Sequence, residues 1–260
     1  MNENYFDADK SEKNENDHTY ESSVKRKPYE IKKGFKYYRT SKIFKLLSKI
    51  AFFLFDLFCA FWLKKFRYKY KVIGKKNLKK VHGAVLISNH VFKYDAALFL
   101  SSLKTKSIIY PTMLKENMGY GFFSLCFRMA GASPIPDGIN QFKSFYRQTI
   151  SLLENKENIL FFPEASMHEY ADHIRPFKHG GFRFAMETNK IIVPVVTTFH
   201  KPKGWFKWIR KGEPTLTTTI LKPYVIEDLG NKKLTLEKAM KDVYEIISSY
   251  YLENSDYFKN

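Results

Sequence analysis

The stretch AVLISNHVFKYDAALFLSSL, residues 84–103, joins two kinds of regular structure. Its first five residues form an apolar run rich in β-formers, and the segment from Asp95 onward has the composition of a helix. Asn89 and His90 would then lie at the carboxyl end of a strand, and Asp95 suits the start of the helix that follows. A strand that leads directly into a helix predicts an α/β fold.

The same alternation continues along the chain. Further β-rich runs lie at residues 107–110, 159–162, 191–199 and 216–221, and helix-like stretches lie near residues 95–104, 118–130, 141–156 and 179–189. Apolar residues from Leu236 to Tyr250 recur at helical spacing and predict a final packed helix. Strands interleaved with helices indicate a mostly parallel central sheet flanked by helices, with loops at the strand ends available for a site.

Charge and aromatic residues are both in excess. The 260 residues include 44 Lys plus Arg against 26 Asp plus Glu, for a formal charge of +18, together with 24 Phe, 17 Tyr and 3 Trp. The chain is too apolar for a disordered basic protein, and the charge favours an anionic partner: a membrane surface, nucleic acid or an acidic carrier protein. We expect an acidic disordered tail over residues 1–24, a basic segment over residues 25–71 and a catalytic body over residues 72–260.

The basic segment contains the apolar run IAFFLFDLFCAFWL, residues 50–63, interrupted only by Asp56. As a helix it would be about 21 Å long, which is short of the ~30 Å hydrocarbon core of a bilayer. Cations flank it on both sides, so we expect a helix that lies in the interface, with the protein monotopic or peripheral; the alternative is a core helix of a soluble domain.

The acidic start of the chain lacks the features of a secretory signal, which favours the cytoplasmic face of the cell membrane. Cys59 and Cys126 stand in apolar contexts and are predicted to be buried thiols.

The first candidate for chemistry is the pair His90 and Asp95. A carboxylate that accepts the proton of one imidazole nitrogen fixes the tautomer, and the other nitrogen is then free to take a proton from a hydroxyl. The competing interpretation of this H-x4-D spacing is a strand-end histidine beside an aspartate that caps the helix.

The second candidate is the segment ILFFPEAS, residues 159–166. Pro163 ends the strand and Glu164 follows as an exposed acid at the same sheet edge, while the small Ser166 lets backbone approach a ligand. Arg175, Lys178 and the two glycines at 180–181 then precede a helix, an arrangement suited to a phosphate. The alternative is a solvated loop with ordinary helix caps.

Six short blocks in order resemble the lysophospholipid (1-acylglycerol-3-phosphate) acyltransferases over about residues 72–225. The blocks are N-H-x4-D at 89–95, the pair Lys115-Glu116, the turn GASPIPDG at 131–138, F-P-E at 162–164, R-P-F-K-x-G at 175–180 and the pair Val193-Pro194. The resemblance implies a glycerolipid acyltransferase-like fold, with His90 as the general base and Asp95 as its orienting partner. The acceptor hydroxyl would attack the acyl donor directly, without an acyl-enzyme, and Glu164 would shape the acceptor pocket.

Two arginines that this family places near the acceptor phosphate are absent here. The family's third block continues F-P-E-G-T-R, whereas Ala165, Ser166 and Met167 follow Glu164, and Gly138 follows Asp137 where the second block has an arginine. Lys115, Arg175 and Lys178 are the nearby cations that we expect to substitute. We expect this loss to broaden or change the acceptor.

The expected co-substrate is acyl-coenzyme A or acyl-carrier protein, with anionic membrane lipids as partners and with no further cofactor. His168 and His173 are five residues apart, which differs from zinc-protease spacing, so no metal is expected. One alternative function is acyl transfer to another membrane acceptor, such as a glycolipid or aminolipid. Another is a non-catalytic basic protein that binds membranes or nucleic acid, although the sequence carries no nucleic-acid-binding signature, so no nucleic-acid partner is expected.

Overall fold

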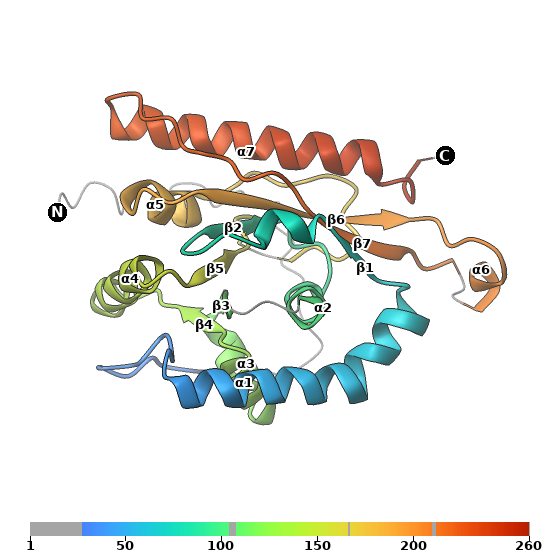
Figure 1. Ribbon diagram of the computed structural model, residues 1–260, viewed down its shortest axis with the longest axis horizontal. Helices are drawn as coiled ribbons and strands as arrows, with labels where there is room; N and C mark the ends of the chain where they lie inside the picture. The colour runs from blue at the N-terminus through green and yellow to red at the C-terminus, as the bar shows by residue number, and fades with distance from the viewer. Residues whose placement is uncertain (1–27, 104–107, 166, 210–211, 260) are drawn as a thin grey trace.

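The structure is a computed structural model that describes residues 28–103, 108–165, 167–209 and 212–259. The predicted acidic tail, residues 1–24, and Ser166 lie outside the described residues. A single sheet runs through the middle of the molecule, with helices on both sides of it (Figure 1).

The described residues form a seven-stranded sheet in the order β1-β7-β6-β2-β5-β3-β4. Its strands are β1 Lys71–Ile73, β2 Val85–Ser88, β3 Ile109–Leu114, β4 Ser133–Ile135, β5 Asn158–Phe161, β6 Ile192–His200 and β7 Thr215–Ile220. Every neighbouring pair is parallel except β6 and β7. The predicted α/β fold with a mostly parallel sheet is confirmed. The strands β1 and β4 were not predicted, because three residues are too few to show a period.

Strand β2 lies between β5 and β6, so the residues that follow it emerge at the middle of the sheet edge. Val85 pairs with Ile159 of β5 and with Ile192 of β6. Since β5 and β6 both run parallel to β2, their carboxyl ends meet at this same edge. The helices of this part of the chain are α2 Asp95–Ser102, α3 Phe122–Met129, α4 Ile139–Glu154, α5 Gly180–Glu187, α6 Trp205–Ile209 and α7 Lys232–Asn254.

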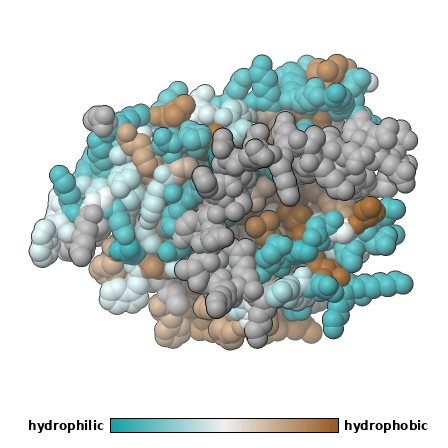
Figure 2. Space-filling model, turned by 180° about the vertical axis from the view of Figure 1, so that it is seen from behind, coloured by the Kyte–Doolittle hydropathy of each residue, from teal (hydrophilic) through white to brown (hydrophobic). Residues whose placement is uncertain are grey.

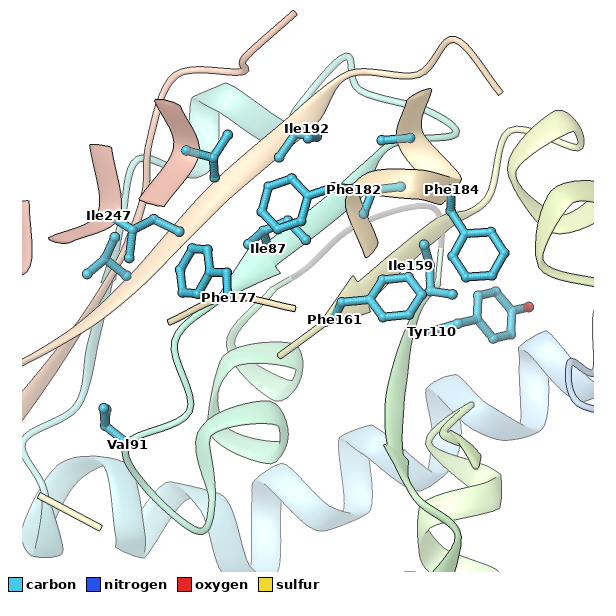
Figure 3. Packing of buried hydrophobic residues seen from close by; sticks show 14 of the residues in the cluster. Ile87, Val91, Tyr110, Ile159, Phe161, Phe177, Phe182, Phe184, Ile192 and Ile247 are labelled. Atoms are coloured by element: carbon cyan, nitrogen blue, oxygen red, sulfur yellow. The ribbon is translucent and has the colours of Figure 1, made fainter. Parts of the chain in front are cut away.

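Alternating side chains of the sheet supply two apolar layers. Ile87 and Phe161 lie in the layer that includes Phe182 of α5 and Ile247 of α7 (Figure 3). Leu86 and Leu160 lie in the opposite layer, which includes Phe99 of α2. Because a strand's successive side chains point to opposite faces, the fully apolar runs seen in the sequence serve both layers at once.

Gly181 of α5 lies directly against the sheet. A Cβ atom there would lie 2.8 Å from Cδ1 of Ile87 and 3.1 Å from Cβ and Cγ of Phe161, both inside van der Waals contact. Gly181→Ala is therefore expected to lower the free energy of unfolding by about 1–3 kcal/mol, measured by urea denaturation. Gly180→Ala is the matched control, since no heavy atom lies within 4 Å of its added Cβ. Equal stability of the two variants would contradict close packing of α5 on β2 and β5.

The apolar run predicted as a helix lies within a longer helical segment. Helix α1 (Lys42–Phe55) continues through two wide-turn segments, η2 (Asp56–Ala60) and η3 (Leu63–Arg67), and we call residues 42–67 the N-terminal rod. Phe44 and Ala60 are buried against the body, and Asp56 pairs with Lys64. No helix among the described residues combines the length and the hydropathy needed to cross a bilayer.

The opposite side of the N-terminal rod carries large apolar side chains that are exposed. They are Ile43, Leu46, Leu47, Ile50, Phe53, Leu54, Leu57, Phe58, Phe61, Trp62 and Phe66. Apolar residues gather along the lower margin of Figure 2, on the side where α1 lies in Figure 1. Exposed Phe122, Phe123 and Leu125 on α3, which contacts α1, extend this surface. Cys126 on α3 is exposed too, so its predicted burial is wrong: the apolar neighbours that suggested a core position face outward themselves.

Candidate active site

His90 is placed by its neighbour Asn89, which fastens the loop after β2 to β6. The Asn89 amide Nδ2 donates to the carbonyl of Thr197 at 3.0 Å, and the backbone N–H of Thr197 donates to Asn89 Oδ1 at 2.8 Å. The His90 ring packs against Phe162, with ring centroids 4.4 Å apart. The His90 side chain keeps 27% of its surface exposed, so a substrate can reach it.

Asp95 binds both the His90 ring and the loop that carries it. Its Oδ2 accepts from the backbone N–H groups of Val91 at 3.0 Å and Phe92 at 2.9 Å and lies 3.3 Å from His90 Nδ1. With Asp95 as the acceptor, Nδ1 carries the proton and Nε2 has a free lone pair, the arrangement that a general base requires. Asp95 is 4% exposed, and this burial raises the pKa of its carboxyl above the usual range, against the opposing effect of His90.

Glu164 connects the end of β5 to the His90 loop. Its Oε1 accepts from the backbone N–H of His90 at 2.8 Å, and its Oε2 accepts from the backbone N–H of Arg175 at 3.3 Å. The prediction of an exposed acid is wrong: the Glu164 side chain is 1% exposed, because both oxygens are directed at backbone donors of the protein itself. Burial raises the pKa of the Glu164 carboxyl. Ala165, which follows it, has φ of +61°, a left-handed conformation that costs an L-residue about 1–2 kcal/mol.

Arg175 holds the loop that follows Glu164. Its Nη2 donates to the carbonyl of Glu164 at 2.7 Å, its Nε lies 3.8 Å from Glu164 Oε2, and its Nη1 contacts His168 Nε2. The backbone of the same loop pairs with the residues after β2, since His168 N–H donates to the carbonyl of His90 and Tyr170 N–H to that of Val91. His90, Asp95, Glu164 and Arg175 are therefore joined by direct hydrogen bonds and ion pairs into one cluster.

The Acyltransferase family model matches residues 69–198, a range that contains this whole cluster. The chain belongs to this acyltransferase family. No curated protein sequence matches the chain at a significant level. Among solved structures, it is similar to the crystal structure of the 1-acyl-sn-glycerophosphate (LPA) acyltransferase PlsC from Thermotoga maritima. That similarity has a TM-score of 0.47 at 18% identity and covers 79% of this chain and 97% of PlsC.

The other predicted site residues of the acyltransferase lie around the cluster at different distances. Lys115 follows β3, two strands away from β2, and forms an ion pair with Asp137. Lys178 has an exposed side chain, and its backbone N–H donates to the carbonyl of Pro163 at 2.9 Å. The proposed phosphate ligands thus divide into Arg175 and Lys178 beside Glu164 and a separate Lys115 on β3.

Several residues that build the candidate site were not predicted. Phe162 belongs to the predicted strand and to the F-P-E block, but no contact with His90 was predicted for it, and its ring packs on His90. His168 was considered only as a metal ligand. Its contact with Arg175 depends on a turn of the chain that no local sequence pattern predicts. Asn89 had a recognisable signal, because a polar residue directly after a buried strand must find partners for its amide.

Proposed function

We propose that this acyltransferase moves a fatty acyl chain from acyl-coenzyme A or acyl-carrier protein to a hydroxyl of a lysophospholipid such as 1-acylglycerol-3-phosphate. The observation that carries the proposal is the His90–Asp95 pair at the carboxyl end of β2, with Nδ1 of the ring 3.3 Å from a buried carboxylate oxygen. This arrangement leaves Nε2 as the proton acceptor in a partly exposed ring.

In the proposed reaction, His90 Nε2 takes the proton of the acceptor hydroxyl as its oxygen attacks the thioester carbonyl carbon. A C–O bond forms, the C–S bond breaks and the electron pair leaves on the sulfur, which takes the proton back from the imidazolium. Asp95 stabilises the imidazolium between these steps. No covalent bond to the protein forms, and no metal or further cofactor takes part.

For the acceptor, we propose a place beside the loop from Glu164 to Lys178. Glu164 fixes the His90 backbone and the start of this loop, and Arg175 fixes its end. Arg175, with 18% of its side chain exposed, and the exposed Lys178 are the cations that would meet the acceptor phosphate, with Lys115 as a further contact.

We further propose that the protein lies on the cytoplasmic face of a membrane, as a monotopic or peripheral protein. The N-terminal rod exposes a continuous series of large apolar side chains, and exposed apolar surfaces of this kind mark sites of interaction with membranes or proteins. Basic residues precede and follow the apolar run in the sequence. Anionic lipid headgroups would attract these cations while the phenylalanines enter the interface.

The test is an acyl-transfer assay in liposomes with labelled acyl-coenzyme A or acyl-carrier protein and a panel of lysolipids, glycolipids and aminolipids. We expect transfer to several lysophospholipids, because the two phosphate-binding arginines of the family are absent. Strict preference for 1-acylglycerol-3-phosphate would contradict the broadened acceptor range. Transfer to glycolipids or aminolipids alone would replace the acceptor class, and no transfer to any acceptor would overturn the proposed activity.

A further inference from the structure

The connection between β6 and β7, residues 201–214, exposes two tryptophans that the proposed reaction does not use. Trp205 and Trp208 of α6 are 67% and 86% exposed, and these are two of the three tryptophans in the chain. Three exposed lysines, Lys201, Lys203 and Lys207, accompany them in the same connection. Large aromatic side chains exposed to this degree are rare on a surface that meets only water.

This connection leaves the sheet at the edge that carries His90. Strand β6 runs parallel to β2, so its last residue, His200, lies at the carboxyl edge where His90 follows β2. In Figure 1, β6 points toward α6 at the right-hand end of the molecule, and the N-terminal rod ends on the same side. Trp205 and Trp208 therefore project beyond the edge at which acyl transfer is proposed.

One ion pair links this connection to the end of the N-terminal rod, and a backbone hydrogen bond joins β7 to the residue that follows the rod. Arg67 Nη2 donates to Glu213 Oε1 at 2.7 Å, and the backbone N–H of Leu216 donates to the carbonyl of Tyr68 at 3.0 Å. Arg67 is the last residue of η3, and Glu213 lies at the return of the connection into β7. The return of the connection into β7 is thus held against the end of the rod.

We infer that the β6–β7 connection is a second membrane-contacting element, with Trp205 and Trp208 in the interface of an anionic phospholipid bilayer and its lysines at the lipid phosphates. Tryptophan favours this interface because its ring is apolar and its N–H is polar. The net charge of +18 and the alternation of lysine with tryptophan complement an anionic surface. The inference rests on the proposed membrane association. It adds that the His90 edge of the sheet faces the bilayer between two membrane-contacting elements, the N-terminal rod and the β6–β7 connection.

The experiment measures binding to vesicles of phosphatidylglycerol and phosphatidylcholine. In Trp62→Phe protein, Trp205 and Trp208 are the remaining tryptophans, and with excitation selective for tryptophan we expect a blue shift of their emission and quenching by brominated lipid. Trp205→Ser/Trp208→Ser is expected to weaken vesicle binding in sedimentation by roughly tenfold or more. Leu234→Ser/Leu252→Ser is the matched control, since these leucines are 53% and 54% exposed on α7, away from the rod, and its binding should equal that of wild type (Figure 1).

The outcomes separate this inference from the proposals on which it rests. Wild-type protein that does not bind the vesicles would overturn membrane association as a whole. If the protein bound the vesicles but Trp205 and Trp208 were not quenched, the β6–β7 connection would not contact the membrane. Equal vesicle binding by wild type and by Trp205→Ser/Trp208→Ser would overturn the same contact, and neither result would overturn membrane association itself. Quenching by acyl-carrier protein but not by vesicles would also overturn it. Acyl transfer between short-chain, water-soluble substrates is measured separately. Trp205→Ser/Trp208→Ser should keep the full wild-type rate in this assay, because the proposed reaction does not use either tryptophan.

Discussion

Replacing His90 with alanine is expected to lower the rate of acyl transfer by about 10²–10⁴-fold, which is the range that a positioned general base contributes. The variant keeps the Asn89 contacts with β6 and the hydrogen bond from the backbone of residue 90 to Glu164, because neither uses the imidazole. We therefore expect a thermal midpoint close to that of wild type. Activity is measured in the liposome assay, and stability by thermal unfolding of the same preparations.

His173→Ala is the matched control for this measurement. His173 lies in the loop after Glu164, but its side chain is 70% exposed and its partner is the adjacent Asp172 rather than a member of the cluster. It should transfer acyl chains at the wild-type rate. If His90→Ala retained wild-type activity, or if the two variants lost activity equally, His90 would not be the base.

Asp95→Asn is expected to cause a loss of similar size, about 10²–10⁴-fold in turnover, without loss of stability at neutral pH. The amide oxygen can still accept from the backbone N–H groups of Val91 and Phe92, which preserves the loop. It carries no charge to stabilise the imidazolium, and its NH₂ group can place the ring in the wrong tautomer. Activity is measured in the liposome assay, and stability by thermal unfolding of the same preparations.

The pH dependence of stability provides a second readout for Asp95. Because burial raises the pKa of its carboxyl, folding opposes ionisation of Asp95 relative to the unfolded chain, although His90 and two backbone N–H groups favour the ionised form. The favourable effect of the raised pKa on the free energy of unfolding is fully present below the ordinary pKa of the carboxyl, and it is lost as the pH rises through the raised pKa. Asp95→Asn should therefore be at least as stable as wild type at pH 7, and its advantage should shrink as the pH falls toward the ordinary value for aspartate.

Asp95→Ala distinguishes the two roles of this residue. It removes the acceptor of two backbone N–H groups, and each buried donor left without a partner costs about 1–3 kcal/mol. We expect it to lose both stability and activity, whereas Asp95→Asn loses activity alone. An asparagine variant as unstable as the alanine variant, or one with full activity, would contradict the proposed division of roles.

The order of strands and helices could be predicted from the sequence because each element has a local cause. Apolar β-rich runs such as residues 84–88 and 159–162 lie within one or two residues of the observed strands. The antiparallel placement of β7 beside β6 could not be predicted, since the residues of a strand do not state which neighbour it pairs with or in which direction. The length of the N-terminal rod was missed because its first turns are basic and amphipathic rather than continuously apolar.

The sequence by itself determined the fold class, the family resemblance and the pairing of His90 with Asp95, because five residues of separation keep the two side chains in one strand-to-helix turn. Only the tertiary structure decided that Glu164 is a buried link, since its donors come from His90 and Arg175, which are 74 and 11 residues away. Likewise, α6 follows the edge of the sheet that carries His90 because β2 and β6 pair in parallel, and this pairing is set by the tertiary structure. Local pattern encodes neighbours in the chain, whereas burial and hydrogen bonding between distant segments depend on how the sheet assembles.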